Sequence, residues 1–278
     1  MQTLNSQLQQ KHPLVPTSNF ASMDEYVGHL IHAKGYEEAA GFARGKSVLD
    51  WGCNNGYGLE LMRSLGCADI SGLDVSPEAI EAARERLGPE TPLILQTGND
   101  APLTSGTYDV VTSLQCIEHV EDVDRYLAEI RRVLNPDGVA IFTTPNGAIR
   151  IDRGMKPWNE YHVVEFFPED LRALLSKHFS SVTISGLFAT DELQRTEIIR
   201  CARARRDARG KTVVGTVRDL LPLPIRRFIR RHTLNGRRPE LTYSTADLFY
   251  SKDKLESALD LLAICSNLHN VAEPRTNR

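Results

Sequence analysis

Residues 46–58 read Lys-Ser-Val-Leu-Asp-Trp-Gly-Cys-Asn-Asn-Gly-Tyr-Gly, and this stretch decides the fold. Its first part, Ser47–Leu49, is typical of a short buried parallel strand that ends at Asp50. The turn that follows carries three glycines, at Gly52, Gly56 and Gly58. A glycine-rich turn between a strand and a helix lets the backbone approach a ligand, and the helix directs free N–H groups at it. The stretch therefore predicts a binding turn for a nucleotide-like cofactor with an anionic end.

The positions of these glycines argue against two phosphate-binding motifs. A Walker loop has Lys followed by Ser or Thr after its last glycine, whereas Gly58 is followed by Leu59 and Glu60. The dinucleotide fingerprint Gly-x-Gly-x-x-Gly is also absent. The turn is therefore expected to hold a cofactor without phosphate groups.

A second strand is expected at Ile70–Leu73, and it ends in Asp74. A carboxylate at the tip of the second strand of an open parallel sheet can accept hydrogen bonds from both hydroxyls of a ribose. Ser76 as N-cap and Pro77 at the first helical position then begin a helix. This order predicts a ribose-binding site at Asp74.

Three segments resemble class I S-adenosylmethionine-dependent methyltransferases. Residues 50–58 are similar to the motif Asp-x-Gly-x-Gly-x-Gly, with Asn54 at the middle glycine, and Asn tolerates left-handed backbone geometry. Residues 74–84 are similar to the motif of an acidic residue, Ser-Pro and a helix ending in Ala-Arg. Residues 115–120, Gln-Cys-Ile-Glu-His-Val, resemble the Glu-His loop of the subgroup that includes ubiquinone-biosynthesis O-methyltransferases. The resemblance covers about residues 29–187.

The resemblance implies S-adenosylmethionine as the cofactor and indicates which residues would hold it. Asp74 would bind the ribose, and the turn 97–99 would line the adenine. Tyr36, in a helix expected over Tyr26–Ala43, would either contact the methionine carboxylate or pack in the core. The full implied set is Tyr36, Asp50, Gly52, Cys53, Asn54, Gly56, Tyr57, Asp74, Val75, Thr97, Gly98, Asn99 and Gln115.

Strands alternate with helices along most of the chain. The further strands expected are Leu93–Gln96, Tyr108–Ser113, Val139–Thr144, Ser181–Leu187 and Asp247–Ser251. The further helices expected are Leu59–Leu65, Asp122–Leu134, Pro168–His178 and Leu255–Ile264. This alternation predicts an α/β fold with a doubly wound, Rossmann-like sheet. The resemblance implies seven mostly parallel strands, the last of them antiparallel, with a helical basic insertion before it.

Four parts are expected along the chain: a flexible tail (1–18), the cofactor-binding core (19–187), a basic and mostly helical insertion (188–240), and a last strand and helix that complete the core (241–278). Residues 200–238 hold 13 Lys and Arg against two Asp. This basic segment is either a solvated helical face or a contact for an anionic membrane surface or lipid-linked substrate. Nucleic acid is not expected as a partner, because no aromatic platform accompanies the arginines.

Composition excludes disordered and membrane-spanning classes. Of the 278 residues, 41% are hydrophobic and 25% are charged, as in ordinary globular proteins. No apolar run approaches the ~18 residues of a membrane span, and the polar N-terminus carries no signal peptide. Five cysteines without C-x-x-C pairing favour a reducing compartment, so a cytoplasmic location is expected. No metal site is expected, because the carboxylates form no recognisable ligand cluster.

Methyl transfer to a hydroxyl requires alignment of donor and acceptor and a base that takes the proton. The segment Trp158–Phe167 contains Asn-x-Tyr-His-x-x-Glu-Phe, which resembles a loop of relatives that modify sugars and other small metabolites. His162 is the expected base, with Glu165 orienting it or holding the loop, and His119 is the rival candidate. The expected substrate contacts are Asn146, Trp158 and Tyr161.

The leading hypothesis is therefore an S-adenosylmethionine-dependent methyltransferase that acts on a hydroxyl of a small molecule, such as a sugar, a nucleotide sugar or a lipid-linked precursor. A second hypothesis is N-methylation of a small amine, which depends less on a histidine base. A third is a non-catalytic binding module that uses its basic insertion to contact anionic lipid or nucleic acid.

Overall fold

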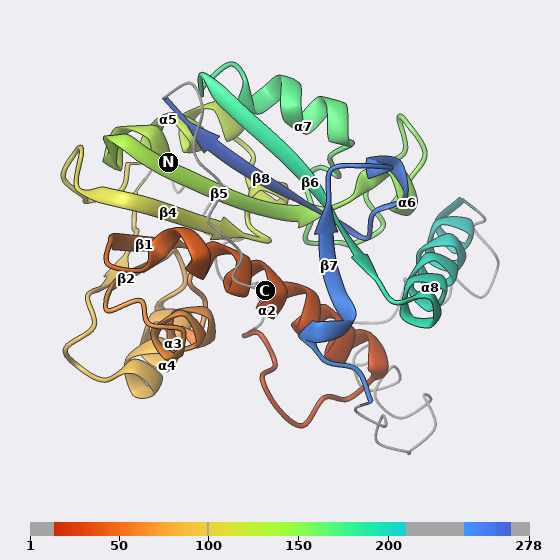
Figure 1. Ribbon diagram of the computed structural model, residues 1–278, viewed down its shortest axis with the longest axis horizontal. Helices are drawn as coiled ribbons and strands as arrows, with labels where there is room; N and C mark the ends of the chain where they lie inside the picture. Colours follow the sequence, from red (N-terminus) through yellow and green to blue (C-terminus); the bar gives the residue numbers. More distant parts are fainter. Residues whose placement is uncertain (1–13, 99, 210–241, 268–278) are drawn as a thin grey trace, which may run out of the picture.

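The computed structural model describes residues 14–98, 100–209 and 242–267. In these residues eight strands form one sheet in the order β3-β2-β1-β4-β5-β8-β6-β7 (Figure 1). The strands are β1 (Ser47–Trp51), β2 (Asp69–Asp74), β3 (Leu93–Leu95), β4 (Tyr108–Leu114), β5 (Leu134–Pro145), β6 (Ser181–Ala189), β7 (Leu248–Ser251) and β8 (Asp260–Ser266). The first five pair in parallel, whereas β8 is antiparallel to both β5 and β6, and β7 is antiparallel to β6. The doubly wound α/β prediction is confirmed.

Helices cover both faces of this sheet, with α2, α3 and α4 on one face and α5 and α7 on the other (Figure 1). The helices are α2 (Met23–Ala43), α3 (Tyr57–Ser64), α4 (Pro77–Leu87), α5 (Val123–Val133), α6 (Gly147–Arg150), α7 (Pro168–Leu175) and α8 (Asp191–Arg209). Short 3-10 turns are η1 (Ile117–His119), η2 (Thr245–Asp247) and η3 (Leu255–Ser257). Within the described ranges, none of these helices combines the length and apolar character that crossing a bilayer requires.

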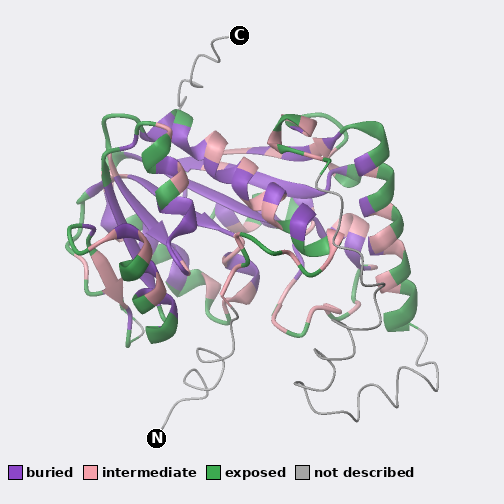
Figure 2. Ribbon diagram, turned by 90° about the horizontal axis from the view of Figure 1, so that it is seen from below, coloured by how far each residue is buried: buried purple, intermediate pink, exposed green. Residues whose placement is uncertain are grey.

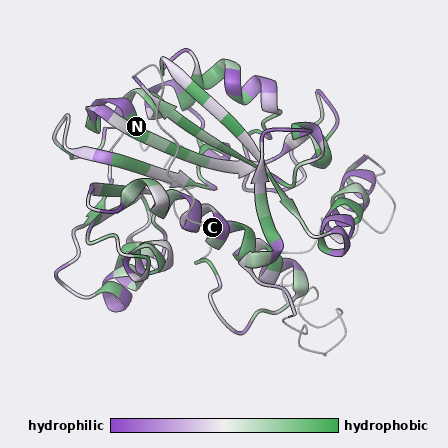
Figure 3. Cartoon of the chain, in the orientation of Figure 1, coloured by the Kyte–Doolittle hydropathy of each residue, from purple (hydrophilic) through white to green (hydrophobic). Residues whose placement is uncertain are grey.

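The central strands are apolar at consecutive positions because both of their faces are covered (Figures 2 and 3). Successive side chains of a strand point to opposite faces. In β1, Val48 packs with the helices α2 and α3, whereas Leu49 packs with α5 and α7. The same division separates Ile141 from Phe142 in β5. Two hydrophobic layers therefore pack against the two faces of the sheet, and this packing holds the strands in place.

Local sequence signals account for the helix starts. Ser76 caps α4, as expected, because its Oγ accepts a hydrogen bond from the Ala79 N–H at 3.2 Å. The Asp122 side chain caps α5 in the same way. Asn54 has φ 46°, so the left-handed geometry predicted at this position is confirmed.

The helix predicted over Leu255–Ile264 is wrong, because the 3-10 turn η3 and then strand β8, from Asp260, occupy this stretch. β8 inserts between β5 and β6, where helices cover both faces, so it is apolar at consecutive positions. A short continuous apolar run fits a buried strand and a buried helix equally well. The described sheet accordingly has one strand more than the seven predicted, and the inserted antiparallel strand is β8 rather than 247–251, which is the edge strand β7.

One other boundary differs from expectation. β6 extends to Ala189 before the basic insertion begins with α8, and residues 210–241 lie outside the described part of the chain. Residues 1–13 of the tail predicted for 1–18 lie outside the described part of the chain. Within the described part of this tail, the Val15 N–H donates to Asn54 Oδ1 at 3.0 Å and the Val15 carbonyl accepts from Asn55 Nδ2 at 2.9 Å. The segment around Val15 is thereby held against the glycine-rich turn.

Substituting Gly58 tests the packing beneath this turn. A Cβ at Gly58 would lie 2.0 Å from Cζ of Tyr36, a ring that is only 2% exposed. We expect Gly58→Ala to lower the free energy of unfolding by about 2 kcal/mol or more, measured by urea denaturation, because overpacking strains a close-packed core. Gly28→Ala is the matched control on α2, since a Cβ there meets nothing within 4 Å. Equal stability of the two variants would contradict this packing.

Candidate active site

The glycine-rich turn between β1 and α3 and the end of β2 meet at the carboxyl edge of the sheet. β1 has β2 on one side and β4 on the other, and the chain order reverses between β1 and β4, which is where open α/β sheets bind ligands. The Asp74 carboxylate is fixed there by two backbone donors: Asn54 N–H at 2.9 Å and Ser76 N–H at 2.8 Å. Each oxygen keeps a lone pair for further hydrogen bonds. This places Asp74 where the sequence predicted a ribose-binding carboxylate.

Asp50 lies fully buried beneath the turn, and its partners are protein hydroxyls. Tyr36 Oη donates to one carboxylate oxygen at 2.9 Å, and Thr112 Oγ1 donates to the other at 2.8 Å. Burial raises the pKa of Asp50 to about 6. The Tyr36 hydroxyl, predicted as a contact for the methionine carboxylate, is instead directed at Asp50. The structure therefore gives both residues a supporting position under the turn.

Tyr57 and His32 form a second buried pair next to the turn. His32 Nε2 lies 3.2 Å from the Leu114 carbonyl, so this nitrogen donates and Nδ1 accepts from the Tyr57 hydroxyl at 2.5 Å. Burial lowers the pKa of His32 to about 4, which keeps the ring neutral. The Tyr57 hydroxyl is therefore already hydrogen-bonded to His32. The backbone of Tyr57, the first residue of α3, still lies directly after the glycine-rich turn.

The remaining cofactor residues predicted from the sequence lie around the same edge. Val75 is 36% exposed next to Asp74, as an apolar surface for a nucleoside requires. Thr97 and Gly98 follow β3 and are exposed, whereas Asn99 lies outside the described residues. Cys53 is buried behind the turn. Asp74, Val75, Thr97 and Gly98 thus follow the neighbouring strands β2 and β3, and their role in binding a nucleoside stays a prediction.

Gln115 has a strained backbone at the end of β4, with φ 54°. Its Nε2 donates to Asp260 Oδ2 at 2.8 Å and lies 3.2 Å from Thr143 Oγ1. Asp260 begins β8 at the carboxyl edge and is buried, and burial raises its pKa well above the ordinary range. Its Oδ1 is buried with no hydrogen-bond partner in the described parts of the chain. Gln115 therefore links the predicted cofactor edge to a carboxylate that the sequence did not indicate.

His162 lies at the end of a buried polar chain. Its Nδ1 is 3.0 Å from Glu165 Oε1, and Glu165 Oε2 accepts from Arg150 Nε at 2.8 Å. Trp158 covers Arg150, with the guanidinium carbon 4.2 Å from the ring centroid. The contact of Glu165 with His162 expected from the sequence is present. Trp158 holds Arg150, and its Nε1 donates to the Arg150 carbonyl at 3.2 Å, so its ring is less available to a substrate than predicted.

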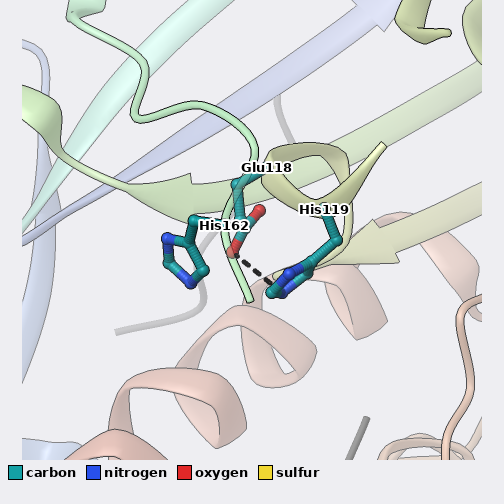
Figure 4. Close-up of side chains that lie close together, drawn as sticks. All are labelled: Glu118, His119 and His162. Atoms are coloured by element: carbon teal, nitrogen blue, oxygen red, sulfur yellow. Dashed lines mark ion pairs between the residues drawn. The ribbon is translucent and has the colours of Figure 1, made fainter. Parts of the chain in front are cut away.

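His119 lies against His162, with ring centroids 4.8 Å apart and ring planes nearly perpendicular (Figure 4). Its Nδ1 is 2.7 Å from the carbonyl oxygen of Tyr161, and burial lowers its pKa to about 4. The neighbouring Glu118 is 1% exposed, accepts from Thr144 Oγ1 at 3.0 Å, and has its pKa raised to about 7 by burial. The two rival histidines of the sequence prediction therefore belong to one cluster, together with a buried carboxylate.

Asn146, predicted as a substrate contact, is completely buried. Its Nδ2 donates to the carbonyls of Leu255 and Ala258 at 2.7 and 2.8 Å, and its Oδ1 caps α6 by accepting from the Ala148 N–H. These contacts leave no exposed atom for a substrate. The prediction is corrected: Asn146 joins the end of β5 to the loop before β8.

Three functional candidates were missed from the sequence: Glu118, Arg150 and Asp260. Glu118 had a usable signal, because it precedes His119 in the Glu-His loop. Arg150 and Asp260 had none, since each reaches the site only through packing between segments that are distant in the sequence. Asp260 also stood inside the stretch that was predicted as a helix.

Buried carboxyl groups outnumber buried Lys and Arg side chains at this edge. The buried carboxylates here are Asp50, Asp74, Glu118, Glu165 and Asp260. Arg150 is the one Lys or Arg side chain that is buried in the part of the chain that the structure describes. Burying ionised groups without partners is unfavourable, so this edge is suited to a positively charged ligand.

With this geometry in hand, comparison with known proteins identifies the family. A family model described as a methyltransferase domain matches residues 23–189, which is more than half of the chain. The chain belongs to this methyltransferase family. The family that the sequence resembles is thereby confirmed.

Two curated relatives illustrate the match to this methyltransferase domain. A probable S-adenosylmethionine-dependent methyltransferase of Mycobacterium tuberculosis is 30% identical over 158 residues, which are 56% of this chain and 57% of the relative. A ubiquinone biosynthesis O-methyltransferase of Thiobacillus denitrificans is 38% identical over 106 residues, which are 37% of this chain and 45% of the relative. The matched part of the chain thus spans about half the length of these curated relatives.

Solved structures share the fold of this methyltransferase at low identity. A possible histamine N-methyltransferase of Thermotoga maritima has a TM-score of 0.53 at 13% identity, over 87% of this chain and 91% of that chain. The [4+2]-cyclase SpnF has a TM-score of 0.52 at 18% identity, over 85% of this chain and 82% of that chain. The fold therefore occurs with more than one reaction, and the chemistry must be argued from the site.

Replacing Asp50 with Asn should change how stability depends on pH. Burial raises the pKa of Asp50 to about 6 in the folded protein, whereas the unfolded chain titrates near the ordinary value of about 4. Between these two values the folded state holds a proton that the unfolded state has released, so this group makes the free energy of unfolding fall as the pH rises through the window. From pH 4 to pH 6 the wild type should lose about 2 kcal/mol relative to Asp50→Asn. Urea unfolding at a series of pH values measures this, and parallel curves would contradict it.

Proposed function

We propose that this protein transfers a methyl group from S-adenosylmethionine to a hydroxyl of a small molecule. The observation that carries the proposal is the convergence of two features on one sheet edge: the Asp74 carboxylate at the tip of β2, and the buried chain Arg150–Glu165–His162 beyond β5. The first is suited to a nucleoside, and the second to proton removal. The two curated relatives described above, both named methyltransferases, support the same reaction class.

The charge of the site supports this donor in particular. S-adenosylmethionine carries a positive sulfonium and a nucleoside without phosphate. The excess of buried carboxylates at the edge favours a cationic ligand, and the glycine positions disfavour a phosphate. Asp74 would accept hydrogen bonds from the ribose hydroxyls through the lone pairs that its two backbone contacts leave open. Val75 would pack against the nucleoside.

The chemical step is an in-line displacement in which the acceptor oxygen forms a bond to the methyl carbon as the carbon–sulfur bond breaks. Holding both reactants in line lowers the activation free energy, by about 7 kcal/mol or more in well-oriented systems. The acceptor hydroxyl must also lose its proton. His162 is the proposed acceptor of this proton at Nε2, because the Glu165 carboxylate takes a hydrogen bond from Nδ1 and stabilises the protonated ring.

A hydroxyl acceptor is preferred over an amine because an aliphatic hydroxyl needs a positioned base, and a histidine held by a buried carboxylate supplies one. The named ubiquinone biosynthesis O-methyltransferase also supports an oxygen acceptor. The proposed acceptor class is a sugar, a nucleotide sugar or a lipid-linked precursor, recognised by the loop that carries Tyr161 and His162. N-methylation of an amine is the second candidate, favoured by the buried carboxylate of Asp260, which could pair with an ammonium group.

Two further proposals concern the setting of the reaction. All five cysteines are unpaired thiols, in keeping with a reducing cytoplasm. The basic segment 200–238 could bring the protein to anionic lipid surfaces that present a lipid-linked acceptor. Only its first part, within α8, lies among the described residues.

Binding of S-adenosylhomocysteine tests the cofactor proposal. We expect Asp74→Asn to weaken binding at least tenfold in isothermal titration calorimetry, because a charge-assisted hydrogen bond to the ribose contributes about 1.5–3 kcal/mol. Asp69→Asn is the matched control, since Asp69 is exposed at the opposite end of the same strand. Unchanged affinity in Asp74→Asn would exclude the ribose contact at this residue.

Turnover of the His162→Ala variant tests the proton acceptor. With a hydroxyl acceptor, kcat should fall about 100-fold or more, while S-adenosylhomocysteine binds as in the wild type. His178→Ala is the control, because His178 forms a similar carboxylate pair with Asp124 (2.8 Å) outside the site. If His162→Ala keeps full activity on the acceptor, the base assignment fails, and an amine acceptor becomes the better explanation.

A further inference from the structure

Glu118, His119 and His162 converge on one point at the carboxyl edge of the sheet (Figure 4). One possible ligand atom from each residue lies within 4.8 Å of the other two. Glu118 and His119 come from η1, directly after β4, and His162 comes from the loop that precedes α7. An imidazole pair with a carboxylate is a common donor set for a divalent transition metal in proteins.

Both imidazole rings are oriented by their second nitrogen. His119 Nδ1 is 2.7 Å from the Tyr161 carbonyl, and His162 Nδ1 is 3.0 Å from Glu165. A carbonyl and a carboxylate can only accept, so in both rings Nδ1 carries the proton and, in the neutral ring, Nε2 carries the lone pair. Metal-binding histidines are held in the same way, by a hydrogen bond from the other ring nitrogen to a carbonyl or carboxylate.

The Glu118 carboxylate is buried close to both histidines. It is 1% exposed, accepts a hydrogen bond from Thr144 Oγ1, and lies 3.9 Å from His119 Nε2. In the described residues no Lys or Arg forms an ion pair with it, whereas the neighbouring Glu165 has Arg150. Burying a carboxylate without a Lys or Arg partner is unfavourable, and a bound cation would stabilise it.

Backbone hydrogen bonds keep the donors of the cluster close to one another. The N–H groups of Val163 and Val164 both donate to the Glu118 carbonyl, at 2.8 and 3.3 Å, and this ties the His162 loop to η1. In a tetrahedral zinc site with bonds of about 2.1 Å, the ligand atoms lie about 3.4 Å apart. Closing from the present separations requires side-chain movements of about an ångström.

We propose that Glu118, His119 and His162 form a binding site for one divalent transition-metal ion such as Zn²⁺, Fe²⁺ or Mn²⁺. Three protein ligands leave coordination positions open, as in catalytic rather than structural sites. Two imidazole nitrogens favour these ions over Mg²⁺ and Ca²⁺, which prefer oxygen ligands. The expectation from the sequence that no metal site is present is thereby replaced.

This inference goes beyond the proposed methyl transfer, because ion binding can be measured without turnover. It also separates two possible roles of His162 in that mechanism. At His162 Nε2, binding a metal and accepting a proton exclude each other. With an ion bound, the positive charge beside the acceptor would itself favour loss of the hydroxyl proton. Experiments on ion-free and ion-loaded protein therefore separate the two roles of His162.

The test is a titration of the full-length, tag-free and chelator-stripped protein with Zn²⁺ in a calorimeter. We expect one ion per chain in the wild type, and a loss of affinity of at least tenfold in Glu118→Gln and in His119→Ala. Glu165→Gln, which alters only the residue behind His162, should weaken binding to a smaller degree. His178→Ala is the control and should bind as the wild type does. Affinity for S-adenosylhomocysteine in each variant shows that the fold is retained.

Co²⁺ provides a spectroscopic check on the ligands. Because all five cysteines are free thiols, binding at a cysteine has to be distinguished from binding at the histidines. Nitrogen and oxygen ligands predict visible absorption without the intense thiolate charge-transfer bands that a cysteine site gives. Thiolate bands, absence of binding in the wild type, or unchanged affinity in both Glu118→Gln and His119→Ala would overturn the site.

The same samples distinguish failure of this site from failure of the proposed function. A protein that binds Zn²⁺ at Glu118 and His119 but methylates no acceptor supports the site and contradicts the proposed function. A stripped protein with full turnover and no Zn²⁺ binding contradicts the site and leaves the histidine base in place. Turnover that is lost on stripping and restored by Zn²⁺ or Mn²⁺, but not in Glu118→Gln, supports the site and gives it a part in the reaction.

Discussion

The burial of carboxyl groups at one edge of the sheet is the constraint on which the rest of this site depends. Each carboxylate there is stabilised differently. Asp50 accepts from two hydroxyls, Asp74 from two backbone N–H groups, and Glu165 from Arg150. Glu118 and Asp260 have fewer partners, and burial raises the pKa of both. Some of the buried carboxyl groups at this edge therefore have few hydrogen-bond or ion-pair partners among the described residues, and this favours ligands that carry positive charge.

The sheet order explains how these groups come together. β1 and β4 are neighbours, so the glycine-rich turn that follows β1 and η1, which follows β4, both lie at the carboxyl edge of the sheet. β8 runs antiparallel beside β5, which places Asp260, its first residue, at the edge where the parallel strands end. The loop after α6 returns to η1 through the Val163 N–H. The catalytic candidates thus depend on backbone hydrogen bonds between segments that are far apart in the sequence.

The fold alone would not justify a methyl transfer. A [4+2]-cyclase shares it at a similar TM-score to a possible N-methyltransferase, so the sheet is a scaffold for several reactions. The proposed methyl transfer depends instead on the Asp74 carboxylate at the tip of β2 and on the cluster of Glu118, His119 and His162. Their neighbours Arg150 and Trp158 lie behind this cluster and hold it in place.

The sequence by itself determined the parallel half of the sheet, the glycine-rich turn, the left-handed Asn54 and the position of Asp74, because strand–turn–helix signals are local. It also indicated the contact between His162 and Glu165, which are three residues apart. Only the tertiary structure decided that the second half of Leu255–Ile264 is a strand, since a run of apolar residues suits either element until its neighbours are known. It alone joined Glu118 and His119 to His162 and directed Asn146 into the core. Those choices depend on packing between distant segments, and no local pattern encodes them.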